Sequence, residues 1–110
     1  MDIEVKEMAR VALLTVKGRV DSNTAQTLGE KLKAQINKGN RYIVADLAGV
    51  EYMSSAGLRE LVGALKMVKN TGGDVRIAAP SDRVKEVLDL AGLTSVFTIF
   101  DDAVSAVGSF

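Results

Sequence analysis

Residues 42–70 read YIVADLAGVEYMSSAGLRELVGALKMVKN and decide the fold, because a strand pattern passes directly into a helix pattern within them. The apolar run Tyr42–Leu47 is typical of a buried strand, and we expect a turn after it at Ala48-Gly49. Apolar residues then recur every three or four positions, which predicts an amphipathic helix that ends near Asn70. Its inward face comprises Leu58, Leu61, Val62, Leu65 and Val68.

Two adjacent serines, Ser54 and Ser55, lie where the strand pattern meets the helix pattern. The first backbone N–H groups of a helix lack intrahelical partners and carry partial positive charge, so a serine oxygen or an added phosphate is stabilised there. Serine is also among the commonest N-cap residues. The pair alone therefore predicts a helix cap, and a modifiable switch needs further support.

The residues before this stretch predict a β-hairpin and an amphipathic helix. Apolar and polar residues alternate over residues 3–6, whereas residues 11–16 are nearly all apolar, so we expect a half-exposed strand paired with a buried one. Asn23 and Gln26 resemble a capping box, and Gly39-Asn40 is a stop signal for the helix between them. The expected inward face of this helix is Ala25, Leu28, Leu32 and Ile36.

The residues after this stretch repeat the alternation of strand and helix. We expect a strand over Val75–Ala79, a helix from the cap Ser81 to Gly92, and a last strand over Val96–Phe100. A short helix over Asp101–Val107 follows. Its expected inward residues are Ala103, Val104 and Val107.

This order predicts the α/β class, with one domain over residues 1–110. We expect a mostly parallel sheet of about five strands, an antiparallel edge strand at the N-terminus, and about four helices. Functional loops in such sheets lie beyond the carboxyl ends of the strands. Residues 20–23 and 53–56 would then lie side by side if their strands are neighbours.

Composition excludes several classes of function. The chain has no cysteine and no histidine, which removes thiolate metal sites and the usual nucleophile pairs of hydrolases. Lys plus Arg and Asp plus Glu are 14 each, so no net field favours nucleic acid. Nucleotide-binding glycine motifs are absent, and scattered acids such as Asp101 and Asp102 are typical of solvated surface. Carboxylates could still hold Mg²⁺ or act as acid and base, with Asp21, Asp46, Asp101 and Asp102 as candidates, so a small carboxylate-based enzyme is the poorest of the alternatives. We expect no enzyme activity, no cofactor and no metal.

The sequence also argues against a membrane location. No run approaches the length of a membrane span, and the first residues include acids where a signal peptide would be basic. We therefore expect a cytoplasmic protein that binds neither membrane nor nucleic acid.

Three motifs together resemble the STAS domain, specifically the bacterial anti-sigma factor antagonists. Residues 18–25 (GRVDSNTA) are similar to the family's first signature. Asp46-Leu47 followed by residues 53–58 (MSSAGL) is similar to its second, and residues 84–93 (VKEVLDLAGL) to a third. The resemblance covers the whole chain and implies a STAS fold.

The resemblance implies roles for single residues. The phosphorylated serine of the family precedes the glycine by two positions, which is Ser55 here. Many members carry aspartate where this chain has Ser54, so Ser54 is expected to cap the helix as that aspartate would. Ser54 is also the alternative phosphate acceptor if Ser55 is not the one. Asp46 is the expected supporting acid near the site. The implied partner-binding residues are Asp21, Ser22, Asn23, Thr24, Met53, Ser54, Ala56, Gly57 and Arg59.

The implied function is a binding switch. The unmodified protein would bind an anti-sigma factor with serine kinase activity and release the sigma factor, and a PPM-type serine phosphatase would reverse the phosphorylation. The departures at Ser54 and Ala56 leave an alternative, which is a STAS scaffold or regulatory subunit of a larger assembly that phosphorylation does not control.

Overall fold

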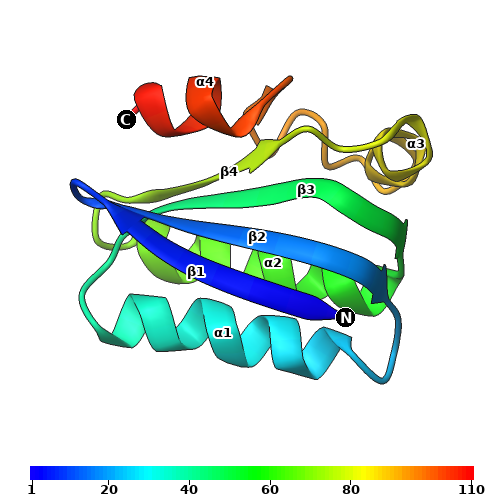
Figure 1. Ribbon diagram of the computed structural model, residues 1–110, viewed down its shortest axis with the longest axis horizontal. Helices are drawn as coiled ribbons and strands as arrows, with labels where there is room; N and C mark the ends of the chain where they lie inside the picture. The colour runs from blue at the N-terminus through cyan, green and yellow to red at the C-terminus, as the bar shows by residue number, and fades with distance from the viewer.

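A five-stranded mixed sheet with helices on both faces forms the framework of the molecule (Figure 1). The computed structural model describes all 110 residues. Its strand order is β1-β2-β3-β4-β5, and only the β1–β2 pair is antiparallel, which confirms the predicted architecture. The elements are β1 Asp2–Met8, β2 Val11–Val20, α1 Ala25–Asn37, β3 Tyr42–Met53, α2 Ser55–Lys69, β4 Asp74–Ala78, α3 Asp82–Leu90, β5 Ile99–Phe100 and α4 Ala103–Gly108.

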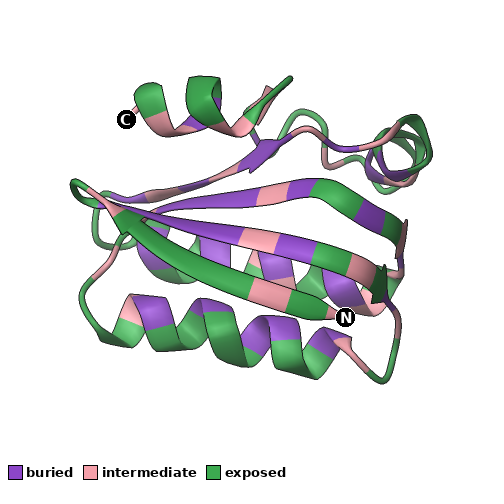
Figure 2. Cartoon of the chain, in the orientation of Figure 1, coloured by how far each residue is buried: buried purple, intermediate pink, exposed green.

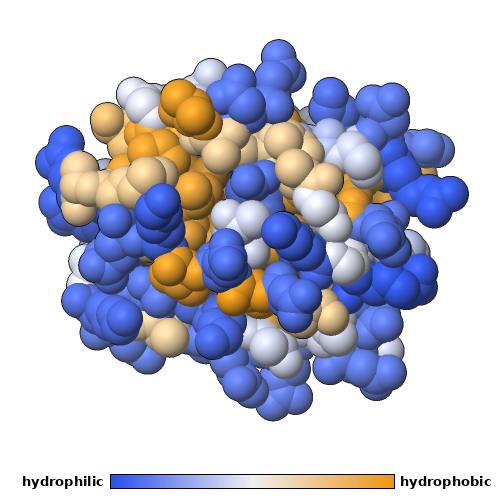
Figure 3. Space-filling view, in the orientation of Figure 1, coloured by the Kyte–Doolittle hydropathy of each residue, from blue (hydrophilic) through white to orange (hydrophobic).

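The core has two parts because strand side chains alternate between the two faces of the sheet. On β3, Ala45 and Leu47 join the larger cluster with α1 and α2, whereas Val44 joins a smaller cluster with Ala106 of α4. The buried stretches of α1 and α2 accordingly face the sheet in Figure 2. The α1 side of the molecule is largely hydrophilic in Figure 3, and apolar side chains gather on the α4 side. Helix α3 contributes its buried Val84 and Leu88 to the larger cluster.

The predicted turn at Ala48-Gly49 is wrong, because β3 continues through it to Met53. The ladder to β2 instead shifts register between Thr15 and Lys17, which is how a bulge absorbs an extra residue while pairing continues. The Ala48 N–H donates to Asp46 Oδ1 at 3.1 Å within this irregularity. Both strands are therefore longer than predicted, and they extend the sheet toward the serine pair.

The C-terminal elements differ in detail from the prediction. The last strand is only Ile99–Phe100, and Val96 lies before it with 46% of its surface exposed. Helix α4 forms with Asp102 as its N-cap, and the Ser105 N–H donates to Asp102 Oδ1 at 2.7 Å. Val104, predicted to point inward, is 83% exposed, and Ala106 is the buried residue. None of the four helices combines the length and the apolar character that crossing a membrane requires.

Candidate functional site

The carboxyl ends of β2 and β3 bring two loops together. Val20 and Met53 are register partners at the last rung of the ladder, and the Ser54 N–H donates to the Val20 carbonyl oxygen at 2.8 Å. The loop that starts at Asp21 therefore lies beside the start of α2, as the predicted neighbouring strands require. Both segments lie at the end of the sheet to which the arrows of β2 and β3 point in Figure 1.

The two serines have different environments at the start of α2. Ser54 has an extended backbone and is the N-cap, and its Oγ accepts a hydrogen bond from the Gly57 N–H at 3.2 Å. Ser55 is the first helical residue, is exposed, and makes no hydrogen bond through its hydroxyl. The expected cap is thus Ser54, and the adjacent hydroxyl is free for chemistry.

Packing beneath the serines explains the glycine two positions after Ser55. A Cβ on Gly57 would lie 2.5 Å from Met53 Sδ and 2.6 Å from Val20 Cγ1, so only glycine lets the first turn of α2 approach both strands. Met53 is only 2% exposed and Gly57 is also buried. Met53 and Gly57 were expected to contact a partner, but both are buried beneath the surface that carries the serines. Ala56 is half-buried and packs against the same core.

Asp21 caps the turn that leads into α1, whereas the N-cap of the helix itself, Thr24, makes no side-chain cap hydrogen bond. The predicted capping box of Asn23 and Gln26 is therefore wrong. Asp21 Oδ1 accepts hydrogen bonds from the Asn23 N–H at 2.9 Å and the Thr24 N–H at 3.1 Å. The Asp21 N–H in turn donates to Thr24 Oγ1 at 2.9 Å, which makes a reciprocal cap of the kind expected three residues apart.

These hydrogen bonds stabilise the ionised form of Asp21. The backbone N–H groups of Thr24 and then Asn23 lower the pKa of the Asp21 carboxyl from its ordinary value, and Arg19 adds a smaller Coulombic contribution. Ser22 and Asn23 are exposed beside it. The loop therefore presents a fixed negative charge next to the serine pair.

Asp46 does not lie with the other predicted site residues. It is seven residues before Met53 on a continuous strand, which is roughly 20 Å at the rise of a β-strand. Its neighbours Ala45 and Leu47 face α2, so the alternation of strand side chains turns Asp46 to the opposite face. The predicted turn at Ala48-Gly49 would have folded the chain back, and without it Asp46 is distant from Ser55.

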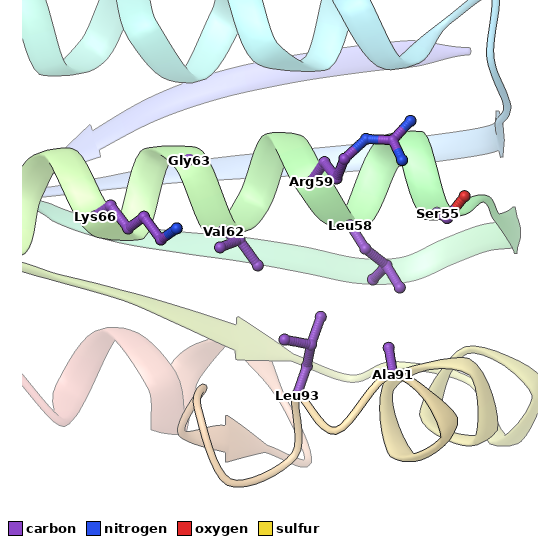
Figure 4. Close-up of a pocket in the computed structure, with 8 residues that line it drawn as sticks. All are labelled: Ser55, Leu58, Arg59, Val62, Gly63, Lys66, Ala91 and Leu93. Atoms are coloured by element: carbon purple, nitrogen blue, oxygen red, sulfur yellow. The ribbon is translucent and has the colours of Figure 1, made fainter.

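A groove runs along α2 from Ser55 toward the loop after α3 (Figure 4). This open groove has a volume of about 450 Å³, and Leu58, Val62 and Leu93 supply its apolar side chains. Its charged members are Arg59 and Lys66, and no acidic residue lines it. Sequence reasoning found Arg59 but missed Lys66 and Leu93, because Leu93 comes from a loop that only the tertiary fold brings to α2.

A second feature missed from the sequence is a stacked pair near the same end of the sheet. The Arg19 guanidinium carbon lies 4.6 Å from the centroid of the Tyr52 ring, a cation–π geometry between register partners of β2 and β3. Only the bulged register brings these two residues together. No group of three or more acidic side chains lies close enough to hold a metal ion.

Comparison with known proteins agrees with this geometry. The family model of the STAS domain matches residues 2–106 of this chain. The anti-sigma-B factor antagonist of Bacillus subtilis (strain 168) is 31% identical over 99 residues, which is 90% of each chain. The crystal structure of an anti-sigma factor antagonist from Mycobacterium paratuberculosis has a TM-score of 0.90 at 22% identity, covering 98% of this chain and 92% of that one.

SpoIIAA provides further structures of the same fold. The anti-sigma factor antagonist SpoIIAA in its unphosphorylated form has a TM-score of 0.85 at 18% identity, over 96% of this chain and 93% of that one. The Bacillus cell fate determinant SpoIIAA in the phosphorylated form has a TM-score of 0.78 at 16% identity, over 98% of both chains. With the match over residues 2–106 and the Bacillus subtilis relative, the chain belongs to the STAS domain family and, within it, to the anti-sigma factor antagonists.

Proposed function

We propose that this chain binds an anti-sigma factor in its unmodified form and is released when Ser55 is phosphorylated. The observation that carries the proposal is the free, exposed Ser55 hydroxyl beside an apolar groove, next to a Ser54 hydroxyl that already caps the helix. The cap holds the acceptor serine in one position without using its oxygen. Such a hydroxyl is available to a kinase and lies on a surface that a partner would cover.

Electrostatics supports release on phosphorylation. A phosphoserine adds about 1.5 to 2 negative charges at neutral pH. A partner that covers Ser55 would have to remove water from this group or bring its own acids near it, and the ionised Asp21 lies on the adjacent loop. Each loss of about 1.4 kcal/mol weakens binding tenfold, so two unfavourable contacts of this size would weaken it about a hundredfold.

The names of the relatives support the same assignment. The Bacillus subtilis relative is an antagonist of the anti-sigma-B factor, and the SpoIIAA fold has been solved in unphosphorylated and phosphorylated forms. By this reasoning an anti-sigma factor with serine kinase activity is the partner in the cytoplasm, and a PPM-type phosphatase restores the unmodified state. The chain supplies only the hydroxyl, while the kinase supplies nucleotide, metal and base.

The test is phosphorylation by the cognate anti-sigma factor with Mg²⁺ and ATP, followed by peptide mass spectrometry. Wild type and Ser54→Ala should each gain one phosphate on Ser55, and Ser55→Ala should gain none. Phosphate on Ser54 alone would show that Ser54, not Ser55, is the acceptor. If neither serine is labelled and the affinity for the partner is the same for wild type, Ser55→Ala and Ser55→Asp, the scaffold alternative replaces the switch.

A further inference from the structure

Arg59 lies one helical turn after Ser55 and has no acidic partner. Residues four apart on a helix are neighbours, and helical side chains lean toward the N-terminus. In Figure 4 the Arg59 side chain extends toward the N-terminal end of α2, where Ser55 lies, on the side of the helix away from Leu93. Both residues line the same groove. The guanidinium thus lies at the same end of α2 as the acceptor hydroxyl, one helical turn from it.

The Arg59 charge is not used elsewhere in the fold. Both ion pairs of the structure involve Asp74, at the far end of the strands, and Arg59 makes no side-chain hydrogen bond. Its helical neighbours three and four positions away are Ser55, Ala56, Val62 and Gly63, none of which is acidic. The guanidinium is therefore free to receive an anion.

We propose that Arg59 receives the phosphate of phosphorylated Ser55 and pairs with it within the same helix. This inference rests on the proposed function, in which Ser55 is the acceptor. A guanidinium can donate two parallel hydrogen bonds to phosphate oxygens, and an anion four residues before a cation is the favourable order on a helix. Phosphorylation then has two effects on the groove: it adds negative charge and it withdraws Arg59 from any acidic group of the partner.

Lys66 provides a matched comparison in the same groove. It follows Ser55 by eleven residues, which is about 16 Å along the helix axis, whereas Arg59 is only about 6 Å along it. Lys66 carries the same charge but lies too far along α2 to pair with a phosphate on Ser55. Substituting each cation separately distinguishes direct pairing from the general charge of the groove.

The test is a ³¹P NMR titration of the full chain with phosphoserine incorporated genetically at position 55. Because Arg59 stabilises the dianion, the second phosphate pKa should be lower in wild type than in Arg59→Gln by about 0.5 unit at low salt. Lys66→Gln should titrate like wild type, and Arg59→Lys should recover part of the shift. The start of α2 acts equally in all four proteins, so the difference isolates Arg59.

The titration also has clear opposing outcomes. Equal phosphate pKa values in wild type and Arg59→Gln would overturn the pairing, as would an equal rise in Lys66→Gln. Salt at about 1 M should reduce the difference, since exposed pairs are screened. The phosphoserine is installed without a kinase, so failure of a kinase to label Ser55 would count against the proposed function and leave this measurement unaffected.

Discussion

Ser54→Ala and Ser55→Ala should differ sharply in stability although they delete the same hydroxyl from adjacent residues. Ser54→Ala removes the acceptor of the 3.2 Å hydrogen bond from the Gly57 N–H, and loss of an N-cap serine costs about 1 kcal/mol. Ser55 is exposed and its hydroxyl makes no hydrogen bond, so Ser55→Ala should change the free energy of unfolding by less than about 0.5 kcal/mol.

The size of the effect in a melting experiment follows from the length of the chain. An unfolding entropy of about 2.1 cal/mol/K per residue gives about 0.23 kcal/mol/K for 110 residues. A loss of 1 kcal/mol therefore lowers Tm by about 4 °C for Ser54→Ala, and Ser55→Ala should stay within about 2 °C of wild type.

Calorimetry with one further variant completes the test. Ser54→Asp should keep the wild-type Tm, because aspartate caps as well as serine and its charge is favourable at a helix N-terminus. Equal melting of the two alanine variants would refute the division between a capping and a free serine. A loss confined to Ser55→Ala would reverse it.

Three further predictions, the first with a control substitution, test the surroundings of the serines. Gly57→Ala should reduce the free energy of unfolding, measured in urea, by about 1 to 2 kcal/mol, because its Cβ meets the Met53 sulfur. Gly63→Ala is the control and should cause no loss, because its Cβ meets nothing within 4 Å. Equal losses in the two variants would contradict the close packing of Gly57 on the strands. The pKa of Asp21 is lowered in the folded state, so its carboxylate stabilises the fold at neutral pH, and this stabilisation is lost as the pH falls through that pKa. The difference in the free energy of unfolding between wild type and Asp21→Ala should therefore narrow below about pH 4. A constant difference from pH 7 to pH 2 would rule out this stabilisation by the Asp21 carboxylate. Asp46→Ala should leave the rate of serine phosphorylation by the kinase unchanged, since Asp46 faces away from α2, and a large loss of rate would mean that this acid acts at the site.

Much of the fold could be predicted because the periodicity of apolar residues agrees with tertiary burial. Leu28 and Leu32 on α1, and Leu61 and Val68 on α2, are fully buried as their helical spacing indicates. A serine cap before α2 was also predictable from a local signal, a serine directly before an apolar helical repeat, and the resemblance to the STAS family assigned that cap to Ser54.

What could not be predicted depends on partners distant in the sequence. Ala48-Gly49 favours a turn locally, but pairing with β2 carries β3 through it at the expense of a register shift. The burial of Met53 follows from that longer strand. Val104 is exposed and Ala106 is buried in place of the predicted Val104. A helix of six residues is too short for its apolar periodicity to show which side faces inward, so its packing on the sheet decides this.

The most direct test of the switch is the affinity of the cognate anti-sigma factor for this chain with serine and with phosphoserine at position 55, measured by calorimetry at the same salt concentration. We expect Kd to be at least tenfold larger for the phosphorylated chain, which corresponds to about 1.4 kcal/mol, while Ser55→Ala keeps the affinity of the unmodified protein. Equal affinity of the phosphorylated and unphosphorylated chains would contradict the account.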